Sequence, residues 1–218
     1  MENTSADQFP FFKATRPAAI RIWHWLAFLF FAASITTVIL NSTLFKMRNN
    51  IDMVQEQVKD KGGSITPLQA RAVAHEYSDK LWTVHKFIGF GLCLLLLFRV
   101  ITEIVISKEK KLGSKISKAM RFPAGTSQKS HYLFAEFGYL FFYLIFILMA
   151  LTGLVLAFED VSWLDPIHKT AKNIHEFLQY AFYTYIVAHI AGVIRADLTQ
   201  HSGIVSRMIN GKINPAND

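Results

Sequence analysis

The sequence contains very little cysteine. Cys93 is its only cysteine among 218 residues, and no C-x-x-C-H motif occurs. A single thiol excludes a framework of intramolecular disulfides, and the missing motif excludes the covalent haem attachment of c-type cytochromes. Neither a disulfide-rich fold nor a c-type cytochrome is therefore expected.

The N-terminus lacks the features of a cleaved signal peptide. Residues 1–12 contain Glu2 and Asp7 in place of a basic head. The first apolar run is also longer than the hydrophobic core of a signal peptide. We therefore expect this run to stay in the protein as a membrane span. No internal repeat is visible beyond the helical pattern.

Long apolar runs are what the sequence has in abundance. Hydrophobic residues make up 52% of the chain, and 19 of its residues are Phe. Four runs each approach the roughly 20 residues that a helix needs to cross a bilayer. The sequence predicts an all-α integral membrane protein, a single domain built as a bundle of four transmembrane helices. The expected spans cover residues 18–42, 81–107, 131–158 and 174–197.

The positive charge is placed on one side of these spans. Lys and Arg number 23 against 16 Asp and Glu, which gives a net charge of +7. The following basic residues flank the spans on the same side: Lys13, Arg16, Arg21, Lys108, Lys110, Lys111, Lys115, Lys118, Arg121, Lys129, Arg195, Arg207 and Lys212. The positive-inside rule makes that side cytoplasmic, together with both termini. The charge therefore indicates orientation and contact of the loop 108–130 with lipid headgroups, not nucleic-acid binding.

The segment 43–80 is the longest piece expected outside the membrane on the opposite face. Residues 51–61 have the composition of a short polar helix, which the pair Gly62-Gly63 should end. The sequence Thr66-Pro67-Leu68-Gln69 is a capping box with proline at the first helical position. The next helix should therefore start outside the bilayer and run into the second span. Residues 159–170 are expected to form a short outer loop along the interface.

Four histidines lie where the spans meet the membrane surfaces. His175 and His189 are fourteen residues apart, so at about 100° and about 1.5 Å per residue they share one helix face, about 21 Å apart. Chain topology places His24 at the cytoplasmic level of His189, and His85 at the outer level of His175. Neutral imidazole is a good axial ligand of haem iron. The pairs predict two haems b, each held by two histidines from facing helices. Phe182 falls midway between His175 and His189 and should fill the gap between the two haems.

A less specific interpretation exists for each histidine. One histidine at a membrane edge is usually an interfacial anchor or a hydrogen-bonding group. Two pairs matched in depth favour ligation, because ionisable groups are costly in a membrane and mark function there. The alternative without haem is a four-helix transporter or sensor that uses histidines for metal ions or protons. It predicts a colourless protein.

Three further residues support the haem interpretation. Arg99 follows His85 by fourteen residues on the same face, where its guanidinium could bind a haem propionate. The alternative for Arg99 is a salt bridge to Glu103, one turn further on. Gly89 and Gly192 follow histidines closely, and their missing side chains would let a porphyrin plane approach the helix. Helix packing explains such glycines equally well.

With these ligands placed, the chain resembles the bacterial dihaem cytochrome b561 family and the related cytochrome b subunits of nickel-iron hydrogenases and formate dehydrogenases. The likeness extends from about Arg16 to Met208. Each motif alone is loose, but their order and spacing together are specific. The matching stretches are Arg21-Ile22-Trp23-His24-Trp25, His85-Lys86 through Gly89 to Arg99, and the pair His175 and His189 with Gly192.

The resemblance implies a function. In that family the matching histidines hold two haems b, and the proteins pass electrons between a periplasmic donor or superoxide and membrane quinone. We therefore expect a multi-pass protein of the bacterial cytoplasmic membrane, with quinone as substrate and a periplasmic redox subunit or a second copy of the chain as candidate partners. The expected metal ligands are His24, His85, His175 and His189, and the expected cofactor-binding residues are Arg21, Gly89, Arg99 and Gly192.

Two roles stay open at this point. The chain is either a quinone-linked oxidoreductase in its own right or a membrane anchor that relays electrons for a separate catalytic subunit of the hydrogenase or molybdoenzyme type. The segment 41–80 is longer than a minimal family member needs. That departure leaves the outer partner undecided.

Overall fold

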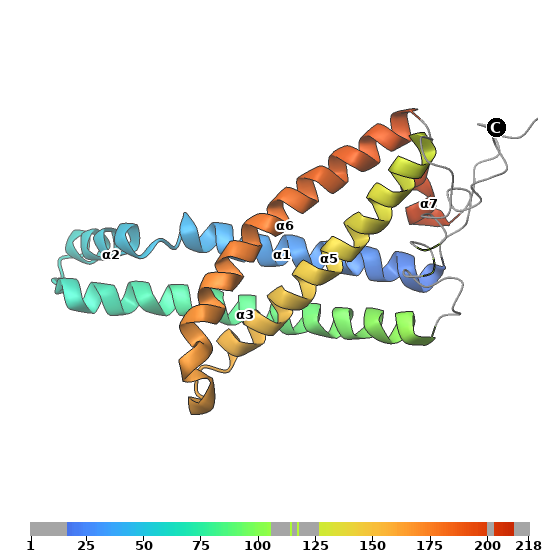
Figure 1. Cartoon of the computed structure of the whole chain (residues 1–218). Helices are drawn as coiled ribbons and strands as arrows, with labels where there is room; N and C mark the ends of the chain where they lie inside the picture. The colour runs from blue at the N-terminus through green and yellow to red at the C-terminus, as the bar shows by residue number, and fades with distance from the viewer. Residues whose placement is uncertain (1–16, 106–113, 115–116, 118–126, 200–202, 212–218) are drawn as a thin grey trace, which may run out of the picture. The chain divides into compact units, whose positions relative to one another are not determined.

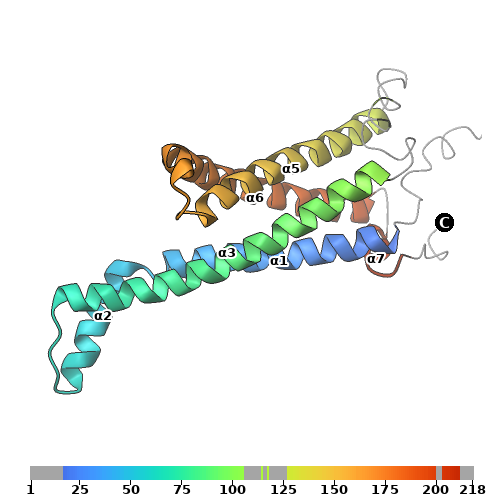
Figure 2. The same cartoon turned by 90° about the horizontal axis from the view of Figure 1, so that it is seen from below.

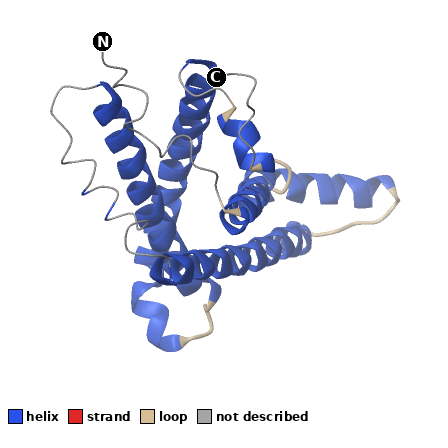
Figure 3. Cartoon of the chain, turned by 90° about the vertical axis from the view of Figure 1, so that its right-hand side faces the viewer, coloured by secondary structure: helices blue, strands red, loops and turns tan. Residues whose placement is uncertain are grey.

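The computed structural model describes residues 17–105, 114, 117, 127–199 and 203–211. The described part of the chain contains helices and loops and no strand (Figure 3). Four helices are long and apolar enough to cross a membrane, which confirms the predicted all-α, four-span fold. They are α1 (Ala18–Ser42), α3 (Pro67–Val105), α5 (Ser127–Ala157) and α6 (Asp165–Thr199) (Figure 1). The shorter elements are α2 (Met47–Asp60), the 3₁₀ turn η2 (Ser162–Leu164) and α7 (Ile204–Asn210).

The four long helices expose most of their apolar side chains. Between 11 and 17% of the most apolar window of each helix is buried inside the protein. Leu94 on α3 and Phe134 on α5, for example, are 68% and 81% exposed. Soluble proteins rarely expose contiguous apolar surface of this extent, whereas a helix that faces lipid does so along its length. The protein is a multi-pass membrane protein.

The start of α3 follows the predicted capping box. The Gln69 backbone N–H donates to Thr66 Oγ1 at 3.3 Å, and the Thr66 backbone N–H donates to Gln69 Oε1 at 3.0 Å. Pro67 occupies the first helical position, where its missing N–H has no helical partner to lose. The helix then continues without a break to Val105. It therefore begins well before residue 81, the predicted start of the second span, and whether its first turns lie outside the bilayer stays a prediction.

The polar helix expected at residues 51–61 is α2. It begins one turn earlier than predicted, at Met47, and ends at Asp60. Gly62 follows with φ +80°, a left-handed conformation that glycine adopts without steric cost. The pair Gly62-Gly63 therefore predicted the end of the helix well. The residues before Met47 contain no comparably clear signal for its start.

The prediction of an outer loop over residues 159–170 was wrong at its C-terminal end. Helix α6 already begins at Asp165, directly after η2. Asp165 lies in the first turn, where a carboxylate is favoured by the helix dipole, and Pro166 follows at an early helical position that tolerates proline. The pair Asp165-Pro166 is therefore a helix start.

The chain divides into two compact units. Unit 1 comprises residues 1–26, 105–149 and 173–218, and unit 2 comprises residues 27–104 and 150–172. The expectation of a single domain stays a prediction. The basic loop predicted at residues 108–130 lies mostly outside the described residues.

In unit 2, α1 and α3 run antiparallel alongside each other (Figure 2). Three contacts show this antiparallel order, because a lower residue number on α1 pairs with a higher residue number on α3. The contacting pairs are Asn41 with Ser78, Thr37 with His85, and Phe30 with Gly91. Near the N-terminal end of α3, Ala70 and Ala74 are fully buried. Small residues at these positions let the neighbouring backbone approach closely.

Gly91 is the position where a larger residue should be costly for packing. A Cβ atom built at Gly91 would collide with the ring of Phe30. We expect Gly91→Ala to destabilise the protein by about 1–3 kcal/mol, the usual cost of overpacking. Thermal unfolding in detergent measures this. The matched control is Gly138→Ala, because a Cβ there meets nothing within 4 Å. Equal unfolding temperatures for the two variants would contradict the close contact.

In unit 1, α5 and α6 pack through a cluster of aromatic rings. Phe182 of α6 lies 6.0 Å from Phe142 and 6.3 Å from Phe146, measured between ring centroids, with each pair edge to face. Phe182 is 4% exposed, and Phe146 is 2% exposed. The ring of Phe182 is therefore core packing between the two helices that carry it and its partners.

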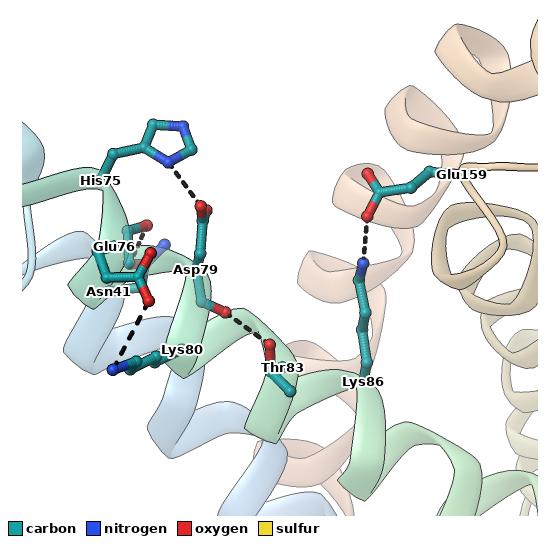
Figure 4. A network of polar contacts seen from close by, with 9 residues as sticks. Asn41, His75, Glu76, Asp79, Lys80, Thr83, Lys86 and Glu159 are labelled. Atoms are coloured by element: carbon teal, nitrogen blue, oxygen red, sulfur yellow. Dashed lines mark hydrogen bonds and ion pairs between the residues drawn. The ribbon is translucent and has the colours of Figure 1, made fainter. Parts of the chain in front are cut away.

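The N-terminal half of α3 carries a network of polar contacts (Figure 4). His75 Nδ1 lies 2.6 Å from Asp79 Oδ2 on the exposed side of α3. Further along the helix, Lys86 Nζ donates to Glu159 Oε1 at 2.6 Å, which ties α3 to the connector after α5. The hydrogen bond and charge of Lys86 hold the pKa of Glu159 below its usual value. Glu159 is therefore ionised at neutral pH and pairs with Lys86.

Candidate functional site

The structure brings His24 and His189 together within unit 1. The two imidazole rings, from the start of α1 and the end of α6, have centroids 6.3 Å apart with planes at 54°. A metal–imidazole bond of about 2 Å and about 1 Å from nitrogen to ring centre place two rings about 6 Å apart across one metal ion. The observed separation fits an iron atom between the two rings.

The surroundings of His24 hold the first turns of α1 in place. Its Nδ1 atom is buried and has no hydrogen-bond partner among the described residues. Trp25 meets the imidazole edge to face at 5.5 Å, and Trp25 Nε1 donates to the backbone oxygen of Met208 at 3.1 Å. The guanidinium of Arg21 lies against Gly211, whose φ is +73°. Helix α7 is thus attached to α1 on both sides of His24.

His189 is oriented by the ring one turn before it. Tyr185 stacks on the imidazole with centroids 5.9 Å apart and planes within 8°. Phe142 of α5 lies 5.1 Å from the Tyr185 ring, which links this stack to the packed core of unit 1. Three residues beyond the histidine, a Cβ at Gly192 would meet nothing within 4 Å. The helix surface at Gly192 is therefore open.

His85 forms a second candidate position, in unit 2. Its Nδ1 atom lies 2.8 Å from Thr37 Oγ1, and Trp82 meets the ring edge to face at 5.3 Å. One turn beyond, a Cβ at Gly89 would also meet nothing within 4 Å. His85 thus has a fixed ring and open helix surface on the same helix, as His189 has in unit 1.

The outer pair stays a prediction. His85 belongs to unit 2, whereas His175 belongs to unit 1 and is half-buried on α6. The pairing of these two residues therefore rests on the sequence spacing and the antiparallel order of the spans.

The two candidate arginines have partners within the chain. Arg99 Nη1 donates to Glu103 Oε2 at 2.9 Å and to Thr102 Oγ1 at 3.3 Å. This is the ion pair that the sequence offered as the alternative to a propionate contact. The guanidinium of Arg21 lies against Gly211. A cofactor role stays a prediction for both arginines.

Sequence reasoning missed three supporting contacts. The stack of Tyr185 on His189 could have been found, because residues four apart share a helix face. The contact of Trp25 with Met208 and that of Thr37 with His85 join residues 183 and 48 positions apart. No local pattern in one sequence reveals such contacts.

Comparison with known proteins gives one result. Neither the curated proteins nor the solved structures contain a match to the chain. The sequence does match a family described as prokaryotic cytochrome b561, over residues 15–211. This range covers almost the whole chain and includes all four candidate ligands. The chain belongs to the prokaryotic cytochrome b561 family and is a membrane electron-transfer protein of the haem b type.

Proposed function

We propose that the protein is a dihaem b-type cytochrome that transfers electrons across the cytoplasmic membrane, between a periplasmic donor and the quinone pool. The proposed cofactors are two haems b, one between His24 and His189 and one between His85 and His175. The observation that carries the proposal is the 6.3 Å separation of the His24 and His189 rings. Quinone is the proposed substrate.

The donor set decides the kind of chemistry. Haem iron with two imidazole ligands supplies a one-electron redox centre without an open coordination position, and therefore suits electron transfer better than oxygen binding. His24 and His189 would hold it at the predicted cytoplasmic level, with Tyr185 fixing the plane of His189. The open helix surface beside Gly192 supports this role, since a bulky residue there would fill the space that a porphyrin needs.

The route between the two levels would follow α6. His175 and His189 lie on one helix, separated by about 21 Å along its axis. Phe182 is buried between them and excludes water from the middle of this route. The arginines are the proposed cationic partners of haem propionates. For Arg99 this means that a propionate replaces or joins Glu103 at the guanidinium.

A second candidate function is favoured by the outer part of unit 2. Helix α2 and the first turns of α3 form a helical segment outside the predicted span, and it exposes Met53, Leu68 and Tyr77. Apolar side chains on an extramembrane surface are typical of protein interfaces. In this role the chain is the membrane anchor of a periplasmic redox subunit and relays its electrons to quinone.

A direct test uses the purified protein in lipid nanodiscs. Addition of a quinol should reduce a low-spin b-type absorption band, and addition of the quinone should reoxidise it. A protein whose haem exchanges no electrons with either form overturns the proposed function. Purification from native membranes separates the two candidates: a co-purifying periplasmic redox subunit selects the anchor, and an isolated chain that reacts with quinol selects the independent cytochrome.

A further inference from the structure

The hydrogen bonds behind His85 fix where its proton lies. Thr37 is 5% exposed on α1, and its hydroxyl makes two contacts. Oγ1 lies 2.6 Å from the backbone oxygen of Ser34 and 2.8 Å from Nδ1 of His85. All three residues belong to unit 2.

The Thr37 hydroxyl has one proton to donate. A carbonyl oxygen only accepts, so two oxygens 2.6 Å apart require that proton between them. The contact with His85 must then run the other way, with Nδ1–H donating to Thr37 Oγ1. A neutral His85 therefore carries its proton on Nδ1. Its Nε2 atom keeps a free lone pair, which is what ligation of a metal requires.

His24, the candidate ligand on α1, has no hydrogen bond of this kind behind its ring among the described residues. The buried Nδ1 of His24 has no hydrogen-bond partner in the described part of the chain. The two histidines contributed by α1 and α3 thus have unlike support: His85 has a buried acceptor behind it, and His24 has none. This asymmetry lies in the chain itself.

We propose that Thr37 is a positioning residue, which holds the His85 ring with Nε2 free and lowers the reduction potential of the haem bound there. The inference rests on the proposed function, because it requires a haem at His85. A hydrogen bond donated from the distal ring nitrogen makes the imidazole a stronger base. A more basic ligand stabilises ferric over ferrous iron, so the potential falls.

The test is an equilibrium redox titration of the purified full-length protein, followed in the haem absorption bands. Thr37→Val removes the hydroxyl and keeps a β-branched side chain of similar size. At a fixed potential, we expect the ferrous-to-ferric ratio of one haem to rise by up to about tenfold, which corresponds to the loss of one hydrogen bond, while the other haem is unchanged. Thr37→Ser retains a hydroxyl and should restore the wild-type curve.

The neighbouring threonine provides a matched control. Thr36 is exposed, and its hydroxyl donates to the Ala32 carbonyl at 2.8 Å, away from any histidine contact that the structure describes. Thr36→Val should leave both redox steps in place. If Thr36→Val and Thr37→Val move the curve equally, the effect is general to the helix and the inference is wrong.

The remaining outcomes separate the inference from the proposed function. Unchanged potentials in a Thr37→Val protein that binds its full haem overturn the role of Thr37 and leave the dihaem proposal standing. Loss of one haem in Thr37→Val, with retention in Thr37→Ser, supports the positioning role. A wild-type protein without haem overturns the proposed function and the inference together.

Discussion

Replacing His24 with alanine is expected to remove one haem b and leave the other in place. The ring centroids of His24 and His189 lie 6.3 Å apart, and the two residues would share one iron atom. Alanine supplies no ligand to the iron. The haem would then be coordinated by His189 of α6 alone and would no longer be bound from α1. The haem-to-protein ratio of the purified variant should fall to about half that of the wild type.

The pairing itself is tested by the companion variants. His189→Ala should cause the same loss, and the double variant His24→Ala/His189→Ala should lose no more than either single variant, because residues that share one site are not additive. His75→Ala is the control, since this histidine is exposed and bonded to Asp79 outside the predicted span. Loss of both haems in the double variant, after one in each single variant, would show that the two histidines serve different haems.

Replacing Gly89 with leucine is expected to expel the haem held at His85 without unfolding the protein. A Cβ at Gly89 meets nothing within 4 Å, so the polypeptide has room for a larger side chain. The same space is where a porphyrin plane would lie against α3. Leucine would fill it, and about half of the haem should be lost while the thermal stability of the haem-free protein is kept.

Two other glycines calibrate this prediction. Gly138→Leu also adds a side chain in open space, yet Gly138 lies on α5, which carries none of the candidate ligands. It should keep both haems. Gly192→Leu should remove the haem at His189. Full haem content in Gly89→Leu would mean that the open side of α3 faces lipid.

The helix boundaries that could be predicted depend on local chemistry. The capping box at Thr66 and Gln69 and the Gly62 stop signal act between residues a few positions apart, and both are present in the structure. The early start of α6 at Asp165 was missed, because an acidic residue followed by proline occurs in loops as well as at helix starts. Length and apolar composition sufficed for the four spans, since a bilayer sets the length of a crossing helix.

For the candidate site, the sequence predicted only the depth of each histidine along the membrane normal. Antiparallel order places His24 and His189 at one level, and the structure adds that their ring centroids lie 6.3 Å apart. The rotation of α3 about its axis brings His85 next to Thr37. This rotation depends on the packing of α3 against α1, so it cannot be predicted from the sequence of either helix alone. For Arg99 the local ion pair with Glu103 is the contact that forms in the structure, because the two residues are one helical turn apart.

The most direct measurement is the number of haem b groups per polypeptide in the purified wild-type protein, from the pyridine haemochrome spectrum and a quantitative amino-acid analysis of the same sample. The four-histidine arrangement predicts two low-spin haems b per chain. One haem per chain would contradict the outer pair, and a colourless protein would contradict the whole account.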